Sequence, residues 1–215
     1  IDITLFPIGL HDQPSELRQI LQTEIDHTDP NRYQRIALAY GLCGKALEGI
    51  TANRLPIVMP RAHDCITLFL GSRDRYQEQF NACPGTYWFA LDYLERSGRN
   101  GTVIPLGATQ TTDLQTVYDE YVKKFGEDNA KYLMEVMESW QKHYTRAVFL
   151  ELGLGNENEI KQKALEIANA RHWNFEIIQG TLDIIFRLLH GEWNEDFLEI
   201  KPGETIKMSA GSEVV

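Results

Sequence analysis

The stretch Ala-Val-Phe-Leu-Glu-Leu-Gly-Leu-Gly-Asn, residues 147–156, decides the fold. Its first six residues are typical of a short buried strand, and its last four form a glycine-rich turn. An amphipathic helix is predicted directly after the turn, over residues 157–171. A strand that passes through a turn into a helix is the repeating unit of α/β folds.

The same order of strand, turn and helix recurs on both sides of this stretch. Strands are predicted over residues 3–8, 35–40, 56–59, 86–91, 175–178 and 197–200, and helices over residues 14–27, 45–50, 64–80 and, with one bend or as two helices, 112–143. A further helix is predicted to bury Leu182, Ile185, Phe186 and Leu189.

This alternation predicts an α/β fold with parallel, Rossmann-like sheets covered by helices. We expect two lobes with a ligand cleft between them. The predicted boundaries are a first α/β lobe over residues 1–92, a helical connection over residues 93–146 and a second α/β lobe over residues 147–215.

The composition excludes several classes of protein. The 215 residues carry 21 Lys and Arg against 31 Asp and Glu, a net charge of −10. An acidic chain lacks the basic surface that nucleic acids and anionic membranes require, and no apolar run reaches the about 18 residues that span a bilayer. The odd count of 3 cysteines favours a reducing compartment, so we expect a cytoplasmic protein.

Four unusual peptides directly follow predicted strands. They are Gly-Leu-Cys-Gly at 41–44, Arg-Ala-His-Asp-Cys at 61–65, Gly-Leu-Gly-Asn at 153–156 and Gln-Gly-Thr at 179–181. Ligands of open parallel sheets bind beyond the carboxyl ends of the strands. The sequence therefore predicts a functional site built from these loops.

Cys43, Cys65 and His63 are the candidate metal ligands. Cys65 is predicted at a helix N-terminus, where a thiolate is stabilised, and thiolates with imidazole suit zinc, iron or an iron–sulfur cluster. The alternative is that both cysteines are small buried hydrophobic residues and that His63 bonds to backbone. The separation of Cys43 and Cys65 matches no zinc-finger pattern.

Asp64 and the nearby arginines complete this candidate site. Asp64 either caps the following helix or orients His63 or a metal ligand. We expect the catalytic, proton-moving residues to be His63 and Asp64. Arg61, Arg73 and Arg75 form a local basic cluster, in which Arg61 and Arg73 are the candidates for holding an anionic substrate. The alternative is that the cluster forms surface ion pairs with Asp74 and Glu78.

Gly153 and Gly155 are predicted to contact the substrate. They form only a fragment of a dinucleotide fingerprint, because the third glycine is absent and acidic residues follow, so we exclude a nucleotide site there. Cys83, in a turn between elements, is interpreted as incidental.

Several motifs resemble the domain of unknown function family numbered 1638, in order along nearly the whole chain. They include Tyr-Gly-Leu-Cys-Gly at 40–44, Pro-Arg-Ala-His-Asp-Cys-Ile at 60–66, Leu-Gly-Ser-Arg at 70–73, Pro-Gly-Thr-Tyr-Trp at 84–88 and Gly-Glu-Trp at 191–193. Members of that family carry an earlier strand that ends in a further cysteine, so the resemblance implies a missing segment before Ile1. Their frequent encoding beside corrinoid-dependent methyl-transfer systems in anaerobes implies one-carbon or methyl-group metabolism.

Two functions from different classes follow. The first is a metal-dependent enzyme acting on a small anionic substrate, with zinc, iron or an iron–sulfur cluster bound by Cys43, Cys65 and His63. The second is a non-catalytic accessory protein that binds a metal or corrinoid-type cofactor for a methyltransferase partner. The chain lacks the Asp-x-His-x-x-Gly peptide of corrinoid carriers, so we do not expect it to be such a carrier itself.

Overall fold

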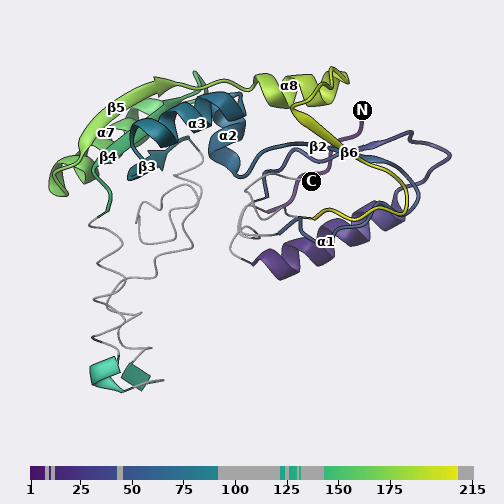
Figure 1. Ribbon diagram of the computed structural model, residues 1–215, viewed down its shortest axis with the longest axis horizontal. Helices are drawn as coiled ribbons and strands as arrows, with labels where there is room; N and C mark the ends of the chain where they lie inside the picture. Colours follow the sequence, from purple (N-terminus) through teal and green to yellow (C-terminus); the bar gives the residue numbers. More distant parts are fainter. Residues whose placement is uncertain are drawn as a thin grey trace. The chain divides into compact units, whose positions relative to one another are not determined.

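The chain forms two compact units, and each is built around its own three-stranded sheet (Figure 1). The computed structural model describes residues 1–7, 10, 13–42, 46–91, 122–123, 126–129, 131 and 143–207. The first unit comprises residues 1–78 and 179–215, and the second comprises residues 79–178. Most of the helical region predicted over residues 112–143 lies outside the described residues.

The sheet of the first unit has the strand order β1-β2-β6. β1 (Ile36–Ala37) runs parallel to β2 (Ile57–Pro60), whereas β6 (Phe197–Ile200) runs antiparallel to β2. The expectation of parallel sheets throughout is therefore wrong for this unit. β6 begins beside the carboxyl end of β2 and runs back along it. At this end the Arg61 N–H donates to the Asp196 carbonyl at 2.7 Å.

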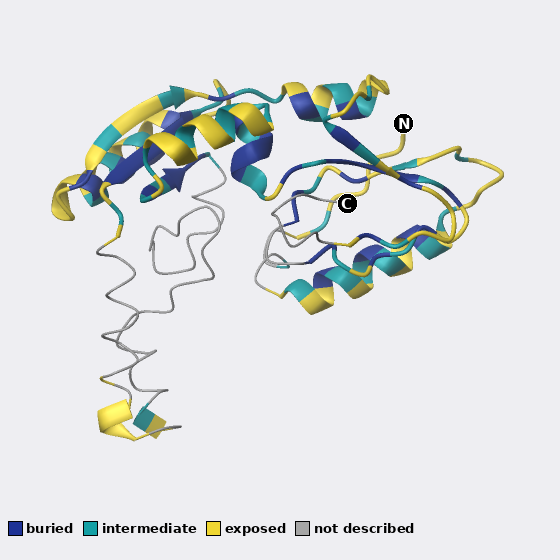
Figure 2. Ribbon diagram, viewed as in Figure 1, coloured by how far each residue is buried: buried dark blue, intermediate teal, exposed yellow. Residues whose placement is uncertain are grey.

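Helices cover both faces of this sheet because the side chains of β2 alternate in direction. Ile57 and Met59 pack in one cluster with three residues of α1 (Pro14–His27), namely Leu17, Leu21 and Ile25. Val58 packs in a second cluster with residues of α2 (Cys65–Leu70) and α8 (Asp183–His190). Figure 2 shows the resulting line of buried residues along β2.

The sheet of the second unit has the strand order β3-β4-β5. β3 (Thr86–Phe89) and β4 (Arg146–Glu151) are parallel, as predicted, with Thr86 opposite Arg146 and Phe89 opposite Phe149. β5 (Asn174–Gln179) lies on the other side of β4. The helix α7 (Glu157–Ala170) packs Ile160, Ala164 and Ala168 against Phe89 and Phe149.

Several local predictions differ from the structure. The helix predicted over residues 64–80 is two helices, α2 and α3 (Arg73–Ala82), because Gly71 ends α2 in the left-handed conformation at φ 81°. Residues 46–49 form turns instead of a helix, and residues 1–7 are not part of a strand. The buried residues of α8 are Ile184 and Leu188, while Phe186 is 56% exposed.

Residues 179–215 belong to the first unit together with residues 1–78, because β6 pairs with β2. Strand pairing across the chain, rather than proximity in the sequence, sets this membership. Within the described ranges, no helix combines the length and the apolar character needed to cross a membrane.

Candidate functional site

The loops that follow β1 and β2 lie backbone against backbone in the first unit. The Leu42 N–H donates to the Ala62 carbonyl at 3.0 Å. Gly41 is buried, and a Cβ placed on it would lie 2.7 Å from the carbonyl carbon of Asp64. Only glycine permits this approach, since real Cβ atoms do not come so close to backbone atoms. The structure thus joins two of the four predicted site loops.

Asp64 caps α2 and also lies next to His63. One carboxylate oxygen, Oδ1, accepts hydrogen bonds from the Thr67 N–H at 3.0 Å and the Thr67 hydroxyl at 3.2 Å, which caps α2. The other, Oδ2, lies 3.4 Å from Nδ1 of His63. The His63 side chain is 50% exposed and that of Asp64 only 15%. A fixed carboxylate therefore faces an accessible imidazole.

Cys65 is the first residue of α2 and is half-buried, beside this pair in the chain. Its helix has only 6 residues, so the helix dipole contributes little to stabilising a thiolate. Cys43 lies outside the described residues, immediately after Leu42 in the sequence. Among the residues that are described, no group of three His, Cys, Asp or Glu side chains is arranged to hold a metal ion.

The arginines near this loop have different surroundings. Arg61 is half-buried and continues the β2–β6 pairing through its backbone N–H. Arg73 lies exposed on the first turn of α3, and Arg75 is committed to backbone carbonyls, donating to Leu70 O at 2.6 Å and to Gln179 O at 2.8 Å. Arg75 therefore does not pair with the nearby carboxylates, as the surface alternative supposed.

The glycine loop after β4 belongs to the second unit and binds its own carboxylate. Glu157 is 8% exposed and accepts hydrogen bonds from the N–H groups of Leu152 at 2.8 Å and Gly153 at 3.1 Å. Gly153 and Gly155 have φ angles of 71° and 56°. Two N–H groups of this loop are thus bonded to a carboxylate of the protein itself. A substrate contact at Gly153 and Gly155 stays a prediction.

The fourth loop, residues 179–181, lies against the far end of α2. The Thr181 N–H donates to the Phe69 carbonyl at 2.8 Å. It is thus attached to the helix that begins at Cys65, but at the opposite end from the cysteine.

Tyr76 lies near the site and was not among the candidates selected from the sequence. Burial, and next to it the Asp64 charge, raise the pKa of Tyr76 to about 12. The phenol is therefore held in its protonated form close to the candidate carboxylate. No sequence signal could have found it, since its proximity depends on the turn between α2 and α3.

Cys83 is not isolated in the second unit. Its sulfur lies 3.5 Å from the Thr145 hydroxyl, and that contact, more than the nearby Arg146 charge, lowers the pKa of the Cys83 thiol. Arg146 itself is buried and donates to Thr86 Oγ1 at 2.9 Å and Gln79 Oε1 at 3.1 Å. These hydrogen bonds connect α3, β3 and β4.

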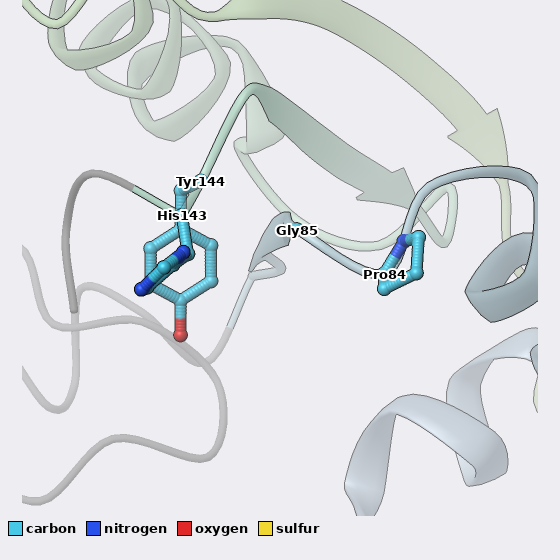
Figure 3. A pocket seen from close by; sticks show the side chains of 4 residues that line it. All are labelled: Pro84, Gly85, His143 and Tyr144. Atoms are coloured by element: carbon cyan, nitrogen blue, oxygen red, sulfur yellow. The ribbon is translucent and has the colours of Figure 1, made fainter.

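A cavity of about 520 Å³ opens beside the starts of β3 and β4. Pro84, Gly85, His143 and Tyr144 line it (Figure 3). A Cβ on Gly85 would lie 2.0 Å from the His143 carbonyl oxygen, so the two segments need glycine to approach. The predicted site residues that the structure describes do not line this cavity, which lies at the amino ends of the two strands.

Comparison with known proteins identifies the family. No curated protein and no solved structure matches the chain. Residues 5–189 match the family described as "Protein of unknown function (DUF1638)". Because this match covers far more than half of its residues, the chain belongs to the DUF1638 family.

Proposed function

We propose that the chain is a metal-dependent enzyme whose centre is held by Cys43, Cys65 and His63. The observation that carries the proposal is the backbone contact between Gly41 and Asp64, together with the Leu42–Ala62 hydrogen bond. Each of these contacts lies within two residues of a candidate cysteine. Two loops that are distant in sequence are thus joined at residues next to the candidate cysteines. Glycine is required at position 41 for this contact.

The donor set suits zinc, iron or an iron–sulfur cluster. Thiolates and neutral imidazole bind zinc and iron in preference to harder cations. His63 is accessible and lies next to Oδ2 of Asp64, while Thr67 bonds the other carboxylate oxygen, Oδ1. A carboxylate beside a histidine can orient a metal-bound imidazole and keep it basic.

The neighbouring residues define the remaining roles. The bound metal would supply Lewis-acid activation of the substrate. His63, or the Asp64 carboxylate that faces it, would move the proton, with Nδ1 and Oδ2 3.4 Å apart. Arg61 and Arg73 would bind an anionic group, since guanidinium donors match carboxylates and phosphates. We place this chemistry in a reducing, cytoplasmic environment, because thiolate ligands must stay reduced.

The broader metabolic setting rests on the family resemblance. It implies one-carbon or methyl-group metabolism and a corrinoid methyltransferase as partner. If the protein carries metal but turns over no candidate substrate that such a partner supplies, the accessory role replaces the catalytic one.

Metal analysis of four proteins tests the centre. The full chain would be purified without oxygen and its metal, sulfide and absorption spectrum measured, alongside Cys43→Ser, Cys65→Ser and Cys83→Ser. We expect stoichiometric zinc, or iron with sulfide and a broad brown absorption, which Cys43→Ser and Cys65→Ser lose and Cys83→Ser keeps. Cys83 is the matched control because it lies in the other unit.

Two results would overturn the proposal. One is a metal-free wild-type protein that takes up neither zinc nor iron when these are supplied under reducing conditions. The other is metal that persists in both Cys43→Ser and Cys65→Ser, because it would then be bound elsewhere.

A further inference from the structure

The cavity at the amino ends of β3 and β4 has no part in the proposed metal centre. Its four lining residues, Pro84, Gly85, His143 and Tyr144, all belong to the second unit. Its volume of about 520 Å³ lies within the range of small-molecule sites. The cavity is therefore large enough to bind a ligand of its own.

Backbone contacts fix the two segments that line this cavity. The N–H groups of Thr145 and Arg146 both donate to the Gly85 carbonyl, at 3.0 and 3.3 Å. A Cβ on Gly85 would lie 2.0 Å from the His143 carbonyl oxygen, so the segments lie closer than any other residue would permit. The fold thus fixes where His143 and Tyr144 stand relative to Pro84 and Gly85.

The Tyr144 ring is held in place by two other aromatic rings of the second unit. Its centroid lies 5.2 Å from that of Tyr87, at an interplanar angle of 87°, and 5.7 Å from that of Trp173. Aromatic pairs at such distances favour defined mutual orientations. Tyr144 also packs against the core that contains Phe149. A ring ordered in this way can stack with a planar ligand without first losing rotational freedom.

His143 supplies a polar group at this cavity. Its side chain is exposed, and within the described ranges its imidazole has no hydrogen-bond or ion-pair partner. An imidazole has an N–H to donate in both of its protonation states. An anionic group that accepts from this exposed ring keeps part of its hydration, which limits the cost of binding it. None of the four lining residues is acidic, so none repels an anion.

We propose that this cavity binds a planar aromatic carboxylate. The aromatic ring of the ligand stacks on Tyr144 and packs against Pro84, and its carboxylate accepts a hydrogen bond from His143. Figure 3 shows the rings of His143 and Tyr144 together on one side, with the ring of Pro84 on the other. The proposal is independent of the metal centre, because Cys65 and His63 belong to the first unit.

Calorimetric titration of the full chain with three related probes tests the ligand class. The probes are 2-naphthoate, the neutral 2-naphthamide and the saturated decahydro-2-naphthoate. We expect 2-naphthoate to bind with a dissociation constant below about 1 mM. The amide lacks the charge and the saturated acid lacks the planar ring, so each should bind about fivefold more weakly. No binding of 2-naphthoate, or equal affinity for all three probes, would overturn the proposal.

Two variants then locate the bound probe. His143→Ala should weaken 2-naphthoate about fivefold and abolish its preference over the amide, because the donor to the carboxylate is gone. Tyr144→Leu should abolish the preference over the saturated acid, because the stacking surface is gone. The matched control is His190→Ala, which removes an exposed histidine of the first unit and should bind all three probes as the wild type does.

The variants can also contradict the proposal. Unchanged preferences in both His143→Ala and Tyr144→Leu would show that the probe binds elsewhere, as would equal losses in His190→Ala. If circular dichroism shows that Tyr144→Leu does not fold, His143→Ala decides the outcome alone. Its side chain is exposed, so its removal leaves the packing of the unit intact, and an unchanged preference for the carboxylate would overturn the proposal.

Discussion

The glycine loops of the two units look alike in sequence and differ in what they do with their polar groups. In the second unit, the loop after β4 gives two N–H groups to the buried carboxylate of Glu157. In the first unit, Gly41 permits close contact with the loop of Asp64, and His63 stays half exposed beside it. A glycine-rich turn after a strand is therefore not by itself a ligand site. What matters is whether its polar groups are paired internally or presented to solvent.

The largest expected effect is the difference in stability between alanine substitutions at Gly41 and Gly153. Gly41→Ala places a Cβ 2.7 Å from the Asp64 backbone, and we expect it to lower the free energy of unfolding by about 3 kcal/mol. The Cβ of Gly153→Ala would have no atom within 4 Å, so only the left-handed backbone at φ 71° disfavours it. We expect this variant to lower the free energy of unfolding by about 1 kcal/mol. Chemical denaturation of both variants measures the difference. Equal losses would show that the loops after β1 and β2 are not in the described contact.

The next effect tests the internal pairing of the second loop. Glu157→Ala leaves two backbone N–H groups without their acceptor, and we expect a loss of about 2 kcal/mol in unfolding free energy. Sulfate should restore part of it, because an anion can replace the carboxylate. The control is Glu159→Ala, whose exposed ion pair with Lys163 contributes about 0.5 kcal/mol or less. A loss in Glu157→Ala no larger than in this control would contradict the internal role.

The smallest effect concerns alkaline pH at the first site. The pKa of Tyr76 is about 12 in the folded chain, above the ordinary value of 10.0. The unfolded chain therefore releases this proton first, and stability that is complete below pH 10 is lost as the pH rises toward 12. Allowing for solvent screening, we expect about 1 kcal/mol. Denaturation across this range should show a shallower decline in Tyr76→Phe, and an identical decline would contradict the burial of the phenol.

Much of the α/β pattern could be predicted because it depends on local periodicity. The helix over residues 14–27 has the predicted bounds, and β4 with α7 follows the strand, turn and helix of residues 147–171 closely. Prediction was wrong where one residue overrides a pattern, as Gly71 does in dividing α2 from α3. It was also wrong for the buried face of α8, because an apolar helix offers several faces and only packing selects one.

The sequence by itself determined the α/β class, the family motifs and the loops on which candidate ligands lie. These depend on residue types and spacings that act within one strand, turn or helix. Tertiary structure alone decided that β6 joins β2 antiparallel, that Gly41 lies against Asp64 and that Arg75 donates to the Gln179 carbonyl. Each of these joins residues far apart in the chain. Such contacts arise from the packing of whole elements, which local patterns do not encode.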